Sequence, residues 1–229
     1  MSAISEFQYL ARRARLSGRR LVHGMLDVAC PEFCAACQNV ATSELLCAAC
    51  QADQLPQLTP RRAVGGDVPS YAPWMYTEAV KQALHRFKFE SHPELARRAA
   101  NAVWRCLPSD LQSPRLWVPV PLAHPRLLER GYNQAALLAR ELAIASCSPA
   151  PRHWLQRESL QQQSGLNRRE RLANALTAFA ATVAARKQTP QSVVLVDDVL
   201  TTGATALGCV EALSAAGHTV VAVATLAQV

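Results

Sequence analysis

Two adjacent aspartates, followed by a loop of small and hydroxyl-bearing residues, carry the clearest chemical signal in this sequence. Residues 193–205 read VVLVDDVLTTGAT, so that Asp197 and Asp198 follow four apolar residues. An uninterrupted apolar run predicts a strand buried on both faces. Because ligands of open parallel sheets bind outside the carboxyl ends of the strands, we expect a binding loop at this point.

The order of residues in this loop suits a phosphorylated sugar. Gly203 lets the backbone approach a phosphate closely, and three threonine hydroxyls, backbone N–H groups and the positive end of the following helix can hold the anion. Two carboxylates would repel a phosphate, so Asp197 and Asp198 are better suited to ribose hydroxyls or to a Mg²⁺ ion carried by a diphosphate. In the alternative interpretation, Thr202 or Thr205 only caps the helix and the aspartates occupy a solvated turn.

Other nucleotide-binding patterns are missing from the sequence. It contains no GxxxxGK[ST], which excludes a Walker loop, and no GxGxxG to support a dinucleotide site.

Four cysteines form a second candidate site. Cys34 and Cys37 make one CxxC pair, and Cys47 and Cys50 make another after a spacer of nine residues. Four thiolates in two tight turns can surround one tetrahedral Zn²⁺ and leave no open coordination position, so the metal would be structural. Cys30 remains an alternative ligand.

Composition narrows the possible partners and the location. The chain has 229 residues, of which 50% are hydrophobic, and a formal net charge of +7. A positive charge favours anionic partners such as phosphorylated metabolites or nucleic acid. No segment approaches the ~18 apolar residues of a membrane span and no secretory signal is present, so we expect a protein of the reducing cytoplasm without a membrane span.

The sequence predicts an α/β protein whose main domain has a parallel sheet. We expect a basic amphipathic helix over residues 1–28, a zinc-binding module over 29–54, a Pro- and Gly-containing linker over 55–70, and the α/β domain over 71–229. In that domain strands are expected at 71–76, 116–120, 152–157, 192–196 and 219–226, and helices at 77–89, 94–107, 134–145, 166–179 and 205–216. Strands that alternate with helices indicate a parallel sheet.

A basic stretch in the middle of the chain could meet a diphosphate. Residues 118–135 read VPVPLAHPRLLERGYNQA, in which Arg126 and Arg130 lie between a strand end and a helix start. Gly131 and Asn133 are typical turn residues there, and guanidinium groups match phosphate oxygens well. The simpler interpretation is a solvated helix face.

Taken together, these motifs resemble the ComF family of bacterial competence-associated proteins. The likeness runs from about residue 26 to the C-terminus, through CxxC…CxxC, Lys88-Phe89, VPVPL…RGYNQ, the 163–179 pattern QxxL…RxxN…F, and VDDVLTTGAT. The resemblance implies a zinc module fused to a type I phosphoribosyltransferase-like domain that binds phosphoribosyl pyrophosphate (PRPP) with Mg²⁺.

The same resemblance assigns roles to individual residues. It implies that Asp197 and Asp198 contact the ribose hydroxyls. The residues expected around the 5-phosphate are Thr201, Thr202, Gly203, Ala204 and Thr205. The diphosphate and flexible-loop positions are Lys88, Val120, Pro121, Arg126, Arg130, Gly131, Asn133 and Gln134.

Three functions follow from these features, and the sequence leaves them open. The first is an enzyme that transfers or hydrolyses a phosphoribosyl group, with Asp197, Asp198 and Arg130 as its catalytic residues. The second is a protein that binds single-stranded DNA during natural transformation and has no transferase activity. The third is a regulator that senses PRPP and docks onto competence proteins.

Overall fold

The computed structural model describes residues 33–41, 44–52, 62–64, 67–89, 94–113, 115–157 and 178–229. The predicted N-terminal helix, Cys30 and the predicted positions 163–174 lie outside these residues. The first helices and strands are α2 (Ala48–Gln51), β1 (Arg62–Val64), β2 (Val68–Tyr71), β3 (Trp74–Met75), α3 (Glu78–Phe89), α4 (Leu95–Cys106), β4 (Leu116–Pro119) and α5 (His124–Arg130). The remaining ones are α6 (Gln134–Ala145), β5 (Leu155–Arg157), β6 (Phe179–Ala181), α8 (Val183–Arg186), β7 (Ser192–Leu200), α9 (Ala204–Ala215) and β8 (Thr219–Gln228).

A largely parallel sheet organises the described part of the chain. Its strand order is β1-β2-β8-β7-β4, and β3 pairs with β8 beyond β2. Within this sheet, the strands pair in parallel except β1 and β2, which are antiparallel. The predicted α/β class with a parallel sheet is therefore confirmed, and the carboxyl ends of β4, β7 and β8 lie at one edge.

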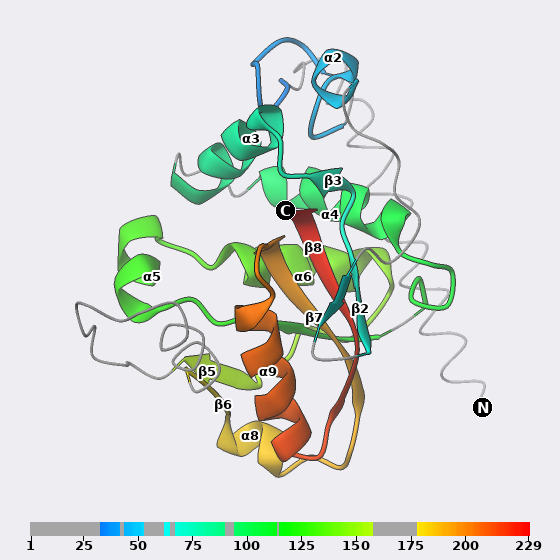
Figure 1. Cartoon of the computed structure of the whole chain (residues 1–229), viewed down its shortest axis with the longest axis vertical. Coiled ribbons are helices and arrows are strands. Elements are labelled where there is room, and N and C mark those ends of the chain that lie inside the picture. The colour runs from blue at the N-terminus through cyan, green and yellow to red at the C-terminus, as the bar shows by residue number, and fades with distance from the viewer. Residues whose placement is uncertain are drawn as a thin grey trace.

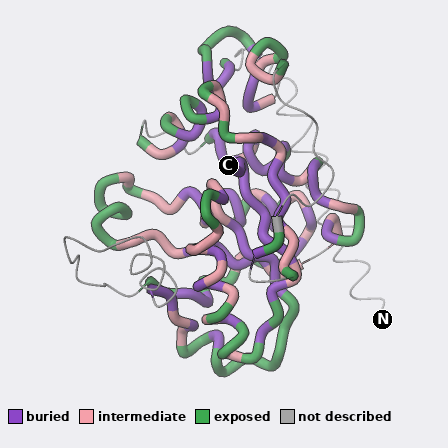
Figure 2. Tube along the Cα trace, in the orientation of Figure 1, coloured by how far each residue is buried: buried purple, intermediate pink, exposed green. Residues whose placement is uncertain are grey.

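Strand β7, which lies between β8 and β4, separates two layers of the hydrophobic core. Because side chains of a strand alternate between faces, Val194 and Val196 contribute to one buried cluster while Val193 and Leu195 contribute to the other. The first cluster includes residues of α3, α4 and α6, and the second includes residues of α9, β5 and β6. Figure 1 shows α9 in front of the strands and α6 behind them, and the buried tube segments in Figure 2 follow the sheet between these layers.

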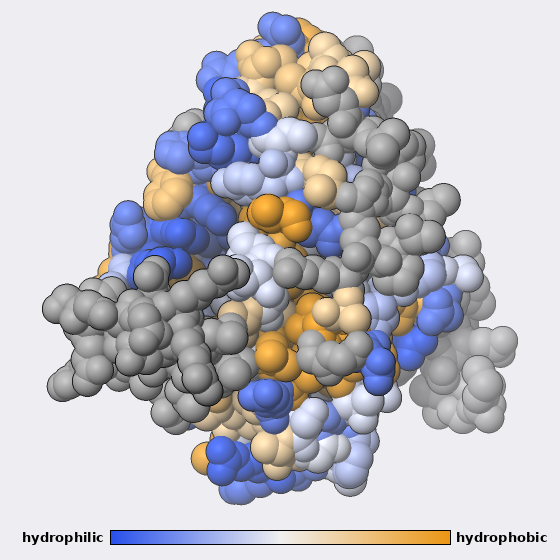
Figure 3. All heavy atoms as spheres, in the orientation of Figure 1, coloured by the Kyte–Doolittle hydropathy of each residue, from blue (hydrophilic) through white to orange (hydrophobic). Residues whose placement is uncertain are grey.

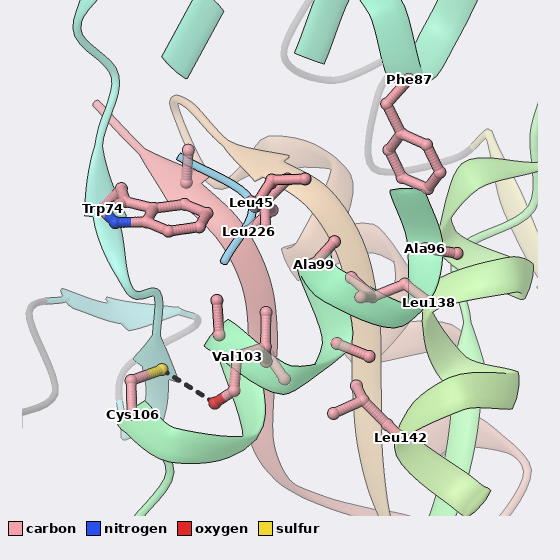
Figure 4. Close-up of a cluster of buried hydrophobic side chains, with 14 of the residues drawn as sticks. Leu45, Trp74, Phe87, Ala96, Ala99, Val103, Cys106, Leu138, Leu142 and Leu226 are labelled. Carbon is pink, nitrogen blue, oxygen red and sulfur yellow. Dashed lines mark hydrogen bonds between the residues drawn. The ribbon is translucent and has the colours of Figure 1, made fainter. Parts of the chain in front are cut away.

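The cysteine-containing segment shares the first of these cores. Leu45 lies beside Leu226 of β8 and near Trp74 of β3 (Figure 4), and all three are buried. Behind them, the alanine-rich face of α4 packs against Leu138 and Leu142 of α6. Small residues on α4 let the two helices approach closely, so the segment and the sheet form one continuous hydrophobic body.

Most predicted elements are present, but the sheet begins earlier than expected. Strands β1 and β2 lie within residues 62–71, most of which the sequence predicts as linker. Pro69 falls inside β2 and pairs with Ala63. Proline removes a ladder N–H group, so it argues against a strand at the sequence level.

Two further boundaries differ from the prediction. β7 continues to Leu200, because β8 runs beside it as far as Gln228, so the aspartates lie within the strand. The predicted helix over 166–179 is wrong at its end, where Phe179 starts β6 and pairs with Arg157. No helix in the described residues has the length and apolarity needed to cross a membrane.

Candidate functional site

The two aspartates of β7 point to opposite faces of the sheet. Asp198 lies on the side of α3, whose Lys88 it contacts, whereas Asp197 lies toward α9, because it interacts electrostatically with Cys209 of that helix and with Arg157. The Nζ of Lys88, in the last turn of α3, lies 2.7 Å from Oδ2 of Asp198. The backbone N–H of Asp198 donates to Oδ1 of Asp197 at 2.8 Å. Alternation along the strand thus gives each carboxyl group a different environment.

Asp197 is held in an environment that disfavours its charge. Burial of the carboxyl group, reinforced by the negative charge of Asp198, raises the pKa of Asp197 to about 8. The hydrogen bond from the Asp198 amide and the charges of Lys88 and Arg157 act in the opposite direction and are outweighed. The raised pKa favours the protonated form of Asp197, beside the ion pair of Asp198 with Lys88.

The predicted phosphate loop leads directly into α9. Thr201 and Thr202 are exposed, and Gly203 adopts φ = 83° at the N-terminal boundary of the helix. Apart from its neighbours along the chain, nothing in the described residues lies within 4 Å of the place that a Cβ of residue 203 would take, so the left-handed backbone rather than crowding requires glycine there. The Ala204 N–H donates to Oγ1 of Thr202 at 3.4 Å. These features leave hydroxyl groups and a helix N-terminus beside the aspartates.

The turn between α5 and α6 lies at the carboxyl end of β4. Asn133 caps α6 by accepting hydrogen bonds from the Ala135 and Ala136 amides, and its Nδ2 donates to the carbonyl of Val120 at 2.9 Å. Gly131 takes φ = 76° and ends α5. The sequence predicted these turn residues correctly, and their contacts attach the basic turn to the strand end.

Two buried N–H donors in this turn have no hydrogen-bond partner in the described part of the chain. Arg130 donates through Nη1 to Oε1 of Gln134 at 3.1 Å, while Nε of Arg130 and Nε2 of Gln134 are both buried and unpaired. The Arg130 guanidinium carbon lies 4.8 Å from the ring centroid of Phe89. Since an unpaired buried donor is unfavourable, these groups are suited to an oxyanion.

The structure brings most of the predicted positions to one edge of the sheet. Lys88, Asp198 and the Arg130–Gln134 turn are connected through the end of α3, and Figure 3 shows hydrophilic side chains gathered over α3 and toward α5. Val120 is buried and Pro121 half-buried at the end of β4. Arg126 is exposed on α5, and among the described residues it makes no hydrogen bond or ion pair with either aspartate.

Arg157 was not predicted from the sequence. It ends β5, its guanidinium carbon lies 5.3 Å from the ring centroid of Phe179, and its charge acts on Asp197. Phe179 itself is buried in the core. A single arginine in a short strand gives no sequence signal, since only the pairing of β5 with β6 brings it near the acidic pair.

The four cysteines of the CxxC pairs form a compact cluster. Their sulfur atoms all lie within 4.8 Å of one another, with 3.7 Å between Cys37 and Cys47. Four sulfurs around one zinc ion with Zn–S bonds of ~2.3 Å would be roughly 3.8 Å apart, so this donor set fits a tetrahedral metal. The cluster could bind a metal such as zinc.

Backbone amides point at the sulfur of Cys34. Burial alone would raise the pKa of this thiol, but hydrogen bonds from the backbone of Cys37, Cys47 and Ala36 lower it to about 6. Burial and the neighbouring sulfurs raise the pKa of Cys50. The turns thus favour the thiolate form of Cys34. A second thiolate next to it, such as that of Cys50, would be favoured only with a cation between the sulfurs.

Comparison with known proteins yields three similar chains. Competence protein F of Haemophilus influenzae is 33% identical over 136 residues, which cover 57% of this chain and 59% of that protein. Competence protein ComFC of Bacillus subtilis is 32% identical over 135 residues, or 58% of this chain and 52% of that protein. The DNA utilization protein YhgH of Salmonella typhimurium is 28% identical over 199 residues, or 76% of this chain and 80% of that protein. The matched region thus spans little more than half the length of the first two relatives. No protein-family model matches the chain.

The raised pKa of Asp197 predicts a pH-dependent effect of Asp197→Asn on stability. In the unfolded chain an aspartate ionises near pH ~3.9, whereas in the folded chain Asp197 keeps its proton to about pH 8. The wild type therefore loses stability as pH rises from about 4 to about 8. Asp197→Asn should match the wild type near pH 4 and become increasingly more stable up to pH 8, as measured by chemical denaturation.

The exposed Asp110→Asn is the control for this measurement and should leave the pH profile unchanged. A difference between Asp197→Asn and the wild type that stays constant from pH 4 to pH 9 would contradict the assignment.

Proposed function

We propose that this chain is a member of the ComF family, which its similarity to three curated relatives supports, and that it binds a phosphorylated ribose at the carboxyl end of β7, with PRPP and Mg²⁺ as the full ligand. Residues 71–229 would then act as a phosphoribosyltransferase-like domain. The observation that carries the proposal is the ion pair of Lys88 with Asp198, beside a second carboxyl group and the glycine turn at Gly203. Acidic groups, basic groups and groups suited to a phosphate follow one another along a single sheet edge.

Charge at this edge permits an anionic ligand. Two ionised aspartates would repel a phosphate, but the pKa of about 8 keeps Asp197 largely protonated at neutral pH, and Lys88 compensates Asp198. A protonated carboxyl group can both donate and accept hydrogen bonds, which suits vicinal ribose hydroxyls. The acidic pair is thus compatible with a sugar phosphate.

The proposed phosphate and diphosphate positions lie on either side of the acidic pair. The 5-phosphate would meet the hydroxyls of Thr201 and Thr202 and the N-terminus of α9. The diphosphate would meet Lys88 and the unpaired N–H groups of Arg130 and Gln134. Mg²⁺ would arrive with the diphosphate, where carboxylate oxygens are ligands of the kind it prefers.

A transfer reaction is compatible with this arrangement. Release of diphosphate from PRPP leaves positive charge on the ribose ring, so catalysis would depend on orientation and on charge stabilisation rather than on a nucleophile. Asp197, Asp198 and Arg130 are the residues that we propose for these roles. Diphosphate release in the presence and absence of candidate bases would distinguish transfer or hydrolysis from binding alone.

Ribose recognition can be tested with a pair of ligands that differ by one hydroxyl group. Wild-type protein should bind ribose 5-phosphate at least ~10-fold more tightly than 2-deoxyribose 5-phosphate, which corresponds to about 1.4 kcal/mol. Asp197→Asn combined with Asp198→Asn should lose this preference, because the carboxyl groups that read the hydroxyl are gone. Isothermal titration calorimetry measures both dissociation constants, with and without Mg²⁺ and with PRPP as the full ligand.

Asp110→Asn, which changes an exposed aspartate away from the sheet edge, is the matched control. The same affinity for PRPP in wild type and the double variant would refute the proposed site.

We propose that the cysteine cluster holds one structural zinc ion. Four protein ligands would complete its coordination, so the metal would stabilise the turns and take no part in chemistry. Purified protein should contain about one zinc per chain by elemental analysis, and Cys37→Ser and Cys47→Ser should lower both zinc content and thermal stability. Cys147→Ser, outside the cluster, should change neither. Metal-free wild type with unaltered stability would rule out a structural zinc.

Binding of single-stranded DNA is the second candidate function. Phe89 is 46% exposed and lies against Arg130, which resembles the aromatic and basic platforms on which bases stack for ~1–3 kcal/mol each. The names of the relatives, which refer to competence and to DNA utilization, favour the same possibility. We propose it as a function that the exposed surface around Phe89 and Arg130 could support.

A fluorescent oligonucleotide tests this second function. Binding should weaken linearly in log salt, and Phe89→Ala should reduce affinity at least ~5-fold, within the range expected for one stacked base. Phe33→Ala removes another exposed phenylalanine, which lies beside the cysteine cluster, and should have no effect. Failure of the wild type to bind at low salt would eliminate this candidate.

A further inference from the structure

The last turn of α3 joins the acidic pair to the basic turn. Successive residues of an α-helix point about 100° apart around its axis, so the four residues from Arg86 to Phe89 leave the helix in four directions. Lys88 reaches Asp198 at 2.7 Å, and Phe89 lies under the guanidinium group of Arg130. The position of this turn therefore decides whether the lysine of the site meets its carboxylate.

The hydrophobic core holds the last turn of α3 on the side of Phe87. Phe87 is 1% exposed, and the hydroxyl group of Tyr132 donates to its carbonyl at 2.6 Å. These contacts attach α3 to the start of α6. Val80, Ala83 and Leu84 set the face that α3 turns to the core. A contact on another side can add to the hold on the last turn, where Lys88 lies.

Arg86 provides that contact, and it reaches into the cysteine cluster. Its Nη1 donates to the carbonyls of Ala35 at 2.7 Å and Ala36 at 2.9 Å. These two residues are the ones between Cys34 and Cys37, so the arginine binds the backbone of the first CxxC turn. Since both carbonyls must face the same nitrogen, the bond depends on the conformation of that turn.

The cysteine segment is itself fixed to the rest of the molecule independently of α3. The buried Arg98 of α4 donates to the carbonyl of Phe33 at 2.9 Å and to that of Glu44. Leu45 packs beside Leu226 of β8 (Figure 4). The segment is thus a fixed support to which Arg86 can attach α3.

We propose that Arg86 is a positioning residue that couples the metal-bound form of the cysteine cluster to ligand affinity at the acidic pair. Metal at the cluster would fix the CxxC turn, the turn would hold Arg86, and Arg86 would keep Lys88 beside Asp198. The inference rests on the proposed function, because the affinity in question is that for the ribose phosphate ligand. Arg86 directs its Nη1 to the carbonyls of the first CxxC turn, so we assign it a positioning role and no contact with the ligand.

A double-mutant cycle tests the coupling. Arg86→Met keeps the length of the side chain and removes its donors, and Lys88→Met does the same for the lysine. Each single variant should weaken PRPP·Mg²⁺ binding by about 5-fold or more, the lower range of measured couplings, while zinc content stays at the wild-type level. The double variant should bind no more weakly than Lys88→Met, because Arg86 acts through the lysine.

Lys81→Met is the control on the same helix. Lys81 is exposed, and its side chain pairs with Glu78 at 3.2 Å, so its replacement should leave affinity unchanged. Additive losses in the double variant would overturn the proposal, since they would show that Arg86 affects the ligand by another route.

A measurement without ligand separates this inference from the proposed function. In zinc-loaded protein, Arg86→Met should speed amide hydrogen exchange over residues 84–89, and removal of zinc from the wild type should have the same effect. Zinc removal from Arg86→Met should add little. If the wild type bound no PRPP, the proposed function would fail, whereas unchanged exchange in Arg86→Met would refute the mechanical connection itself.

Discussion

The arrangement of the site depends on two adjacent carboxyl groups at the end of a buried strand. Asp197 lies toward α9 and Asp198 toward α3, so Lys88 forms its ion pair with Asp198 and acts on Asp197 only through its charge. On the α3 side, Lys88 compensates the charge directly. On the α9 side, burial favours the protonated acid instead. The placement of α3, which has to carry a lysine to this point, follows from that requirement.

This requirement also explains why the cysteine segment packs onto the helices rather than standing apart. A lysine side chain loses considerable conformational freedom when it is held in one place, so the helix that bears it must itself be fixed. Hydrogen bonds from Arg86 and Arg98 to backbone carbonyls of the segment supply this support. Leu45 adds burial in the core shared with β8. A module that looks separate in the sequence is structurally part of the sheet domain.

The sequence predicted well those features that depend on neighbouring residues. Four consecutive apolar residues indicated β7, the CxxC spacing indicated the sulfur cluster, and Asn133 was recognised as a turn residue before α6. Features that depend on distant residues were not predictable. Arg86 contacts a carbonyl 51 residues away, and Arg157 approaches Asp197 only after β5 pairs with β6. Strand β2 was missed because Pro69 argues locally against a strand, although β1 and β8 pair with it.

The edge of the sheet has an inner and an outer part, which favour different ligands. The side chains of Lys88 and Asp198 are only 21% and 16% exposed, so they suit a small molecule better than a polymer. Phe89 and Arg126 lie outward and are exposed, as a surface for a polymer requires. A sugar phosphate and the end of a nucleic-acid strand share the same chemical groups. The two candidate functions therefore differ in how deeply the ligand enters, and the ion pair of Lys88 with Asp198 marks the boundary between them.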